Sequence, residues 1–162
     1  MPRVSVTRVV AATQQDVWSV ISDLTKARRW NASWANIEIT SHQTHGAGTE
    51  FRAHTEDGDT FEFRVSDWVA PEYISFTPLR DPSERYSIAL ESHSFRLRPV
   101  GEDATEVDLI AEASAHGVRG RFIAMFFWSG YQKQGMEAVL DAIQEIFEGS
   151  PELETESPNA TG

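Results

Sequence analysis

The feature that most limits the fold of this chain is a long helical segment close to its C-terminal end. No proline occurs from Arg119 to Glu148, and apolar residues in the second half of this segment recur at helical spacing. These residues are Met136, Val139, Leu140, Ile143, Ile146 and Phe147. A helix of this length extends about 45 Å, enough to cross a small domain. The rest of the chain therefore has to supply a long surface that covers one side of it.

Most of the chain before this helix alternates apolar and polar residues, which is typical of strands with one buried face. The expected strands cover residues 4–10, 35–41, 48–56, 60–69, 73–77, 87–98 and 105–116. Turn signals separate them, including the tight-hairpin sequence Glu-Asp-Gly-Asp at residues 56–59. One-sided burial predicts an antiparallel sheet whose other face is in water.

Two short helices are expected between the first and second strands. Thr13 and Asp16 have the spacing of a capping box, and an apolar stripe follows it. A second short helix is predicted over residues 25–30. The result is an α+β fold in which one long helix packs on the concave face of a curved antiparallel sheet of about seven strands.

Composition excludes several kinds of site and partner. The length of 162 residues fits one domain, expected over residues 1–148, and the acidic tail 149–162 is expected to be disordered. The absence of cysteine excludes disulfides and thiolate chemistry. A net charge of −11 without a basic stripe argues against nucleic acid. The longest apolar run, 122–128, is too short to span a bilayer, and a cytoplasmic protein is expected.

The layout resembles the START-related helix-grip superfamily, in its polyketide cyclase/dehydrase-like and lipid-transfer-like branch. The resemblance covers about residues 3–148, and it depends on residues 11–18 (AATQQDVW), 23–31 (DLTKARRWN), 68–76 (WVAPEYISF) and the long helix. Two alanines replace the proline that is usual before the first helix, a small departure. The resemblance implies a cavity between the sheet and the long helix that holds an apolar or aromatic molecule. Members of this superfamily differ in ligand, and only some are enzymes.

The segment from Phe126 to Met136 carries aromatic, Ser, Gln and Gly residues where a helix that only sealed a core would carry Leu and Ala. Each glycine costs a helix about 1 kcal/mol relative to alanine. One interpretation is that the inner side of this segment lines a ligand pocket. The residues concerned are Met125, Ser129, Gln132 and Met136. The alternative is that the Ser and Gln side chains bond to backbone groups in a fully packed core.

Aromatic residues elsewhere are further candidates for ligand contact. Trp30 and Trp34 follow the second short helix, where the cavity of the superfamily usually opens. An indole offers a ring-containing ligand a flat apolar face and one hydrogen-bond donor. The sheet supplies three more candidates from the inward faces of its strands. These are Phe51, Phe63 and Phe76.

The strand over residues 87–98 has apolar residues on different faces at its two ends, so a bulge near Ser92 is expected. Without a bulge, Glu91 and His93 point into the cavity together. A His beside a carboxylate is a candidate general base for an aldol-type cyclisation or a dehydration. The alternative is a solvated or structural pair.

Metal and cofactor signals are weak in this sequence. His42, His45 and His54 have no acid at a supporting spacing, so solvated imidazoles are expected and no metal is predicted. Neither a nucleophile elbow nor a phosphate-binding glycine loop occurs. No cofactor is expected.

Three apolar residues of the long helix, Ile123, Phe126 and Phe127, fall off its inner face. The expectation is that the short helices cover them. The alternatives are an apolar mouth, a homodimer patch or a partner site.

The sequence therefore predicts a protein that binds a hydrophobic or aromatic small molecule, such as a lipid, polyketide or isoprenoid, without catalysing a reaction. A polyketide aromatase/cyclase or dehydratase that uses the same cavity is the first alternative. A protein-interaction module that uses Phe126 and Phe127 is the second.

Overall fold

The computed structural model describes residues 2–81 and 88–148. Its helices and strands follow the predicted order. They are β1 (Arg3–Val10), α1 (Gln14–Ile21), a 3-10 helix (Leu24–Arg29), β2 (Trp34–Ile39), β3 (Glu50–Thr55), β4 (Thr60–Val69), β5 (Tyr73–Arg80), β6 (Ile88–Pro99), β7 (Thr105–Ala115), α2 (Gly117–Ile123), a π-helical turn (Ala124–Trp128) and α3 (Ser129–Glu148). The predicted tail, 149–162, lies outside the described residues.

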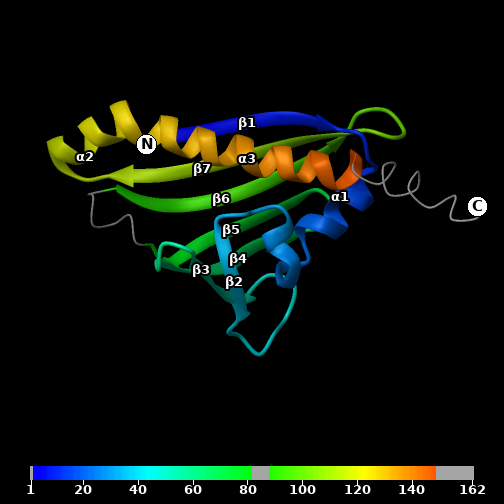
Figure 1. Cartoon of the computed structure of the whole chain (residues 1–162), viewed down its shortest axis with the longest axis horizontal. Coiled ribbons are helices and arrows are strands. Elements are labelled where there is room, and N and C mark those ends of the chain that lie inside the picture. The colour runs from blue at the N-terminus through cyan, green and yellow to red at the C-terminus, as the bar shows by residue number, and fades with distance from the viewer. Residues whose placement is uncertain (1, 82–87, 149–162) are drawn as a thin grey trace, which may run out of the picture.

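The seven strands form one antiparallel sheet in the order β1-β7-β6-β5-β4-β3-β2. Figure 1 shows α2, the π turn and α3 as one continuous helix that lies along this sheet, beside β1 and β7. The predicted helix-grip architecture is confirmed. It follows from the one-sided strands, because only a long apolar helix can cover so much inward-facing apolar surface.

The first short helix begins as the sequence predicts. Thr13 has an extended backbone and its hydroxyl accepts a hydrogen bond from the backbone N–H of Asp16 at 3.2 Å. This bond satisfies one of the free donors at the helix N-terminus. The buried residues Val17, Trp18 and Ile21 then pack α1 against the core.

The C-terminal half of the long helix is fixed from both sides. On its inner face Met136, Leu140 and Ile143 are fully buried in the core. On its outer side the Arg8 guanidinium of β1 forms ion pairs with Glu137, at 2.7 Å, and with Asp141. These charges sit at the border of the helix–sheet contact and fix its position along β1.

The N-terminal half of the long helix is covered on one side only. Gly120, Ala124 and Trp128 are buried, the last two as part of the hydrophobic core. Phe126 and Phe127 are 60% and 63% exposed, so the expectation that the short helices cover them is wrong. The reason is topological: in Figure 1 α1 lies toward the end of the long helix that α3 forms, away from α2, and the 3-10 helix contacts α3.

A bulge interrupts β6, as the sequence predicts. The pairing of β6 with β7 shifts between Leu90 and Ser92. The extra residue returns the apolar positions on both sides of the shift to the inner face, so that Ile88 and Phe95 are both buried. Glu91 lies at the shift and is exposed.

Candidate functional site

A cavity of about 520 Å³ lies between α3 and the sheet. Its walls come from five parts of the chain: the segment that enters β2, the β3–β4 hairpin, β4, β6 and the first half of α3. Aromatic side chains form much of the wall, and Glu56, Asp57 and Asp59 of the hairpin lie at its edge. No Lys or Arg is among the lining residues. A cavity of this size and lining is typical of small-molecule sites.

Five of the residues that the sequence analysis singles out meet at this cavity. Three of them, Trp34, Phe63 and Met136, supply apolar surface. The other two, His93 from β6 and Gln132 from α3, supply polar groups from opposite walls. Residues from β2, β4, β6 and α3 therefore converge on one cavity.

Trp30, Phe51 and Phe76 lie behind this wall rather than on it. Each is at least 97% buried, and none lines the cavity. The Phe51 ring packs on Phe63 at a centroid distance of 5.4 Å, and the Trp30 ring packs on Trp34 at 5.6 Å. In this structure they hold the lining aromatics in place, instead of offering a surface of their own.

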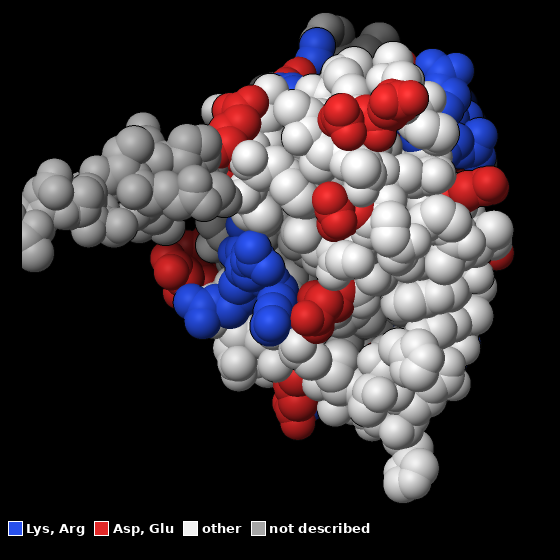
Figure 2. Space-filling model, turned by 90° about the vertical axis from the view of Figure 1, so that its right-hand side faces the viewer, with Lys and Arg blue, Asp and Glu red and all other residues white. Residues whose placement is uncertain are grey.

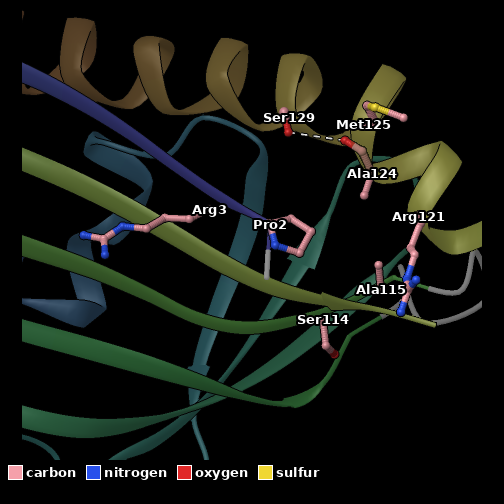
Figure 3. A pocket seen from close by; sticks show the side chains of 8 residues that line it. All are labelled: Pro2, Arg3, Ser114, Ala115, Arg121, Ala124, Met125 and Ser129. Carbon is pink, nitrogen blue, oxygen red and sulfur yellow. Dashed lines mark hydrogen bonds between the residues drawn. The ribbon is translucent and has the colours of Figure 1, made fainter.

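Met125 and Ser129 line a different cavity, of about 640 Å³, on the β1–β7 side of the long helix. Figure 3 shows its lining, with Arg121 and Met125 on the helix and Ser114 and Ala115 on β7. The Ser129 hydroxyl donates to the carbonyl oxygen of Ala124 at 3.3 Å, so this serine does have a backbone partner. The four helix residues expected on one wall are thus divided between two cavities.

The environment of His93 makes it the most unusual titratable group of the site. Burial lowers its pKa from 6.5 to about 4, although the Gln132 side chain and the charge of Asp81 act in the opposite direction. The imidazole is therefore neutral at pH 7. Its Nε2 atom is buried and has no hydrogen-bond partner among the described residues. A neutral ring nitrogen in this position is suited to exchange a hydrogen bond with a ligand.

Glu91 does not join His93. The bulge in β6 turns Glu91 out to solvent, while His93 stays on the inner side. The Glu91–His93 pair that the sequence allowed is therefore not assembled, and Glu91 is not part of this site. The acid that acts electrostatically on His93 is instead Asp81, which is 6% exposed and accepts a hydrogen bond from the backbone N–H of Leu90 at 2.9 Å.

Several lining residues were not among the sequence candidates. Leu90 and Tyr131 carry no motif, and Asp81, which acts on His93 without lining the cavity, was not a candidate either. Gly135 lines the cavity and has nothing within 4 Å of the position a Cβ would take. It is one of the glycines that set the segment 126–136 apart from a helix that only seals a core.

The remaining histidines show no shared site. His42 and His45 are exposed, and the Nδ1 atom of His54 lies 3.1 Å from the Thr60 hydroxyl. Within residues 2–81 and 88–148, no three His, Asp or Glu side chains come together in a way that could hold a metal ion. The same residues contain no helix that is long and apolar enough to cross a membrane.

Comparison with solved structures supports the fold. XoxI from Bacillus cereus superposes with a TM-score of 0.73 at 15% identity, over 91% of this chain and 96% of that chain. A START superfamily protein from Mycobacterium smegmatis gives 0.67 at 18% identity, over 91% and 97%. Truncated norcoclaurine synthase from Thalictrum flavum gives 0.71 at 16% identity, over 89% and 91%. At these identities the likeness concerns the fold alone.

Comparison at the level of sequence gives two results. None of the curated proteins matches this chain. The model of the family described as polyketide cyclase / dehydrase and lipid transport matches residues 1–148, which include every described element and both cavities. The START-related resemblance of the sequence is thereby confirmed, and the chain belongs to the polyketide cyclase / dehydrase and lipid transport family.

Proposed function

We propose that this protein binds a hydrophobic or aromatic small molecule, of the lipid, polyketide or isoprenoid kind, in the cavity between α3 and the sheet. The observation that carries the proposal is the composition of its wall. Aromatic rings from Trp34, Phe61 and Phe63 surround a space into which His93 and Gln132 bring a few polar groups. Burial of apolar ligand surface contributes about 25 cal/mol per Å² before ordering costs.

The charges of the site narrow the ligand further. His93 is neutral at pH 7, and the lining contains three acids but no Lys or Arg. A carboxylate or phosphate taken into this cavity would lose its hydration without gaining a counter-charge. The proposed ligand is therefore uncharged in its buried part, with an oxygen or N–H group that His93 and Gln132 orient.

Two glycines of α3 allow a direct test of the cavity. Gly135 lines it and Gly130 does not, and a Cβ at either position meets no atom within 4 Å. Gly135→Trp should weaken binding of the neutral fluorophore N-phenyl-1-naphthylamine at least about tenfold, because the indole occupies ligand space. Gly130→Trp, the matched control, should bind it as the unchanged protein does. Fluorescence titration measures both.

The two substitutions have the same effect on the helix itself, since each replaces glycine by a better helix former. A loss of binding in both variants, or in neither, would count against this cavity as the binding site. Native mass spectrometry of the protein purified from its own host would then identify any molecule that it retains.

A cyclase or dehydratase that uses the same cavity is the second candidate, and the unpartnered Nε2 atom of His93 favours it. The low pKa limits this role, because an imidazole with a pKa of about 4 is a weak proton acceptor. For an enzyme, His93→Ala should abolish turnover of a poly-β-ketone substrate while the fluorophore still binds. For a carrier, no turnover exists to be lost, and the substitution alters affinity alone.

A further inference from the structure

The outer side of α2, the π turn and the first turn of α3 exposes a run of large apolar side chains. Each is more than half exposed, and together they are called here the aromatic face. Its members are Val118, Phe122, Met125, Phe126, Phe127 and Tyr131. The rings of Phe122 and Phe126 lie 4.7 Å apart, so these two side chains form one apolar surface across a helical turn.

Packing inside the domain does not account for the aromatic face. The buried side of the same segment consists of Gly120, Ala124 and Trp128, and none of the six side chains of the aromatic face belongs to the buried core. The segment is therefore apolar on both sides. A helix of that kind is normally covered on both sides, and a large exposed apolar patch marks an interaction surface.

The charge around the aromatic face has the opposite sign from that of the whole chain. The chain has a net charge of −11, yet residues 113–136 contain no Asp or Glu and carry Arg119, Arg121 and Lys133. All three are exposed, and none forms an ion pair with a described residue. The opposite end of the molecule, seen in Figure 2, carries acidic and basic side chains together.

We propose that the aromatic face docks on an anionic lipid surface. A helix that lies in the membrane interface buries its apolar side chains at the boundary between headgroups and acyl chains, and its basic residues contact the headgroups. Phe and Tyr side chains suit that depth, and Arg119, Arg121 and Lys133 supply the charge. Each basic side chain near an anionic surface raises partitioning about fivefold.

A second copy of the chain is a poorer occupant. The commonest arrangement of two identical chains is a two-fold dimer, in which each patch meets itself. Such a dimer would bring Arg119 and Arg121 of one copy close to those of the other, without an acid between residues 113 and 136 to neutralise them. An anionic membrane satisfies the apolar side chains and the cations at the same time.

The position of the aromatic face relates it to both cavities. Arg121 and Met125 also line the 640 Å³ cavity, as Figure 3 shows, and Tyr131 also lines the 520 Å³ cavity. Docking on this side would place both cavities beside the lipid. If the proposed function holds, an apolar ligand can then exchange with the membrane without crossing bulk water, but the docking itself does not depend on what the cavities hold.

Vesicle flotation with the full chain tests the proposal. Vesicles of phosphatidylcholine with phosphatidylglycerol should retain the protein, and vesicles of phosphatidylcholine alone should retain at least about tenfold less, because the electrostatic attraction is absent. Binding to the anionic vesicles should fall as salt is raised, since the Debye length shortens. Salt-independent binding, or equal binding to both vesicles, would overturn the electrostatic part of the proposal.

Two variants separate the contributions of charge and apolar surface. Arg119→Glu with Arg121→Glu, and Phe122→Ser with Phe126→Ser, should each reduce partitioning at least about tenfold. Leu79→Ser is the matched control, because Leu79 is also an exposed apolar residue, 45% exposed, but lies on β5. It should partition like the unchanged protein. Circular dichroism shows whether each variant is folded. If Phe122→Ser with Phe126→Ser does not fold, the result for Arg119→Glu with Arg121→Glu decides the test.

Light scattering separates membrane docking from self-association. The protein should be monomeric in the absence of lipid. A stable dimer that Phe122→Ser with Phe126→Ser abolishes, together with no retention by anionic vesicles, would overturn the proposal and assign the aromatic face to a second copy.

Discussion

Replacing Phe51 by alanine should lower the free energy of unfolding by about 3–5 kcal/mol, the range for removal of a buried aromatic ring. Phe51 is 1% exposed. Its ring contacts those of Trp34, Phe63 and Phe76 at centroid distances of 5.9, 5.4 and 5.8 Å. The substitution leaves a cavity and removes three ring contacts at once. Urea unfolding followed by circular dichroism measures the change.

Phe126→Ala is the matched control, because Phe126 is 60% exposed and the same atoms are removed from the surface. Its effect should stay within about 1 kcal/mol. The comparison also bears on the site. A Phe51→Ala variant that kept its stability but lost the fluorophore would show that Phe51 contacts the ligand, which the structure argues against.

Lowering the pH from 7 to 4 should destabilise the protein by about 3 kcal/mol through His93 alone. The folded-state pKa of His93 is about 4, below its ordinary value of 6.5. Between these two pH values the unfolded chain binds a proton that the folded protein does not bind. The contribution of neutral His93 to the free energy of unfolding is therefore fully present above pH 6.5, and it is lost progressively as the pH falls toward 4.

Carboxylates also titrate in acid, so the effect of His93 has to be measured as the difference between the unchanged protein and a variant that lacks this histidine. His93→Gln keeps a polar side chain of similar size that does not titrate. The difference in unfolding free energy between the unchanged protein and this variant should be constant above pH 7 and should decline between pH 6.5 and 4. A difference that stays constant down to pH 4 would mean that His93 is solvated in the folded protein. A ligand that accepts a hydrogen bond from His93 should reduce the decline.

The order and type of the elements could be predicted because each depends on local pattern. Thr13 caps α1 through a bond to a residue three positions away, and the alternation of β7 buries Val107, Leu109 and Ala111 as expected. The bulge in β6 could also be predicted from the sequence. The apolar residues at the two ends of this strand alternate on different faces, and an inserted residue is needed to bring both sets to the inner face.

Which residues line the cavity could be predicted less well, because this depends on the curvature of the sheet. Phe51 and Phe63 are direct cross-strand partners on the same inner face, yet Phe63 lines the cavity and Phe51 is packed. No local pattern separates them. The consequence of the bulge for Glu91 and His93 was left open for a related reason, since the number of residues that the bulge displaces depends on pairing with β7.

The error at Phe126 and Phe127 has a different origin. The sequence predicts the length of the long helix and the presence of the short helices, but not which end of it they contact. Strand order decides that question. Because β1 and β2 are at opposite edges of the sheet, the segment that joins them crosses at one end of the domain only, and the other end of the helix stays uncovered.

The π turn at Ala124–Trp128 changes the angular phase of the long helix partway along its length. One additional residue in a turn rotates everything beyond it by about 100° relative to a regular helix. The exposed side chains differ along the helix: they are large and apolar before and within the turn, as at Phe122, Phe126 and Phe127, and mainly charged or polar after it, as at Lys133, Glu145 and Glu148. Deletion of a single residue there would restore regular winding and turn one part of the helix away from its present neighbours, so the exposed positions 125–127 should tolerate substitution far better than a change in length.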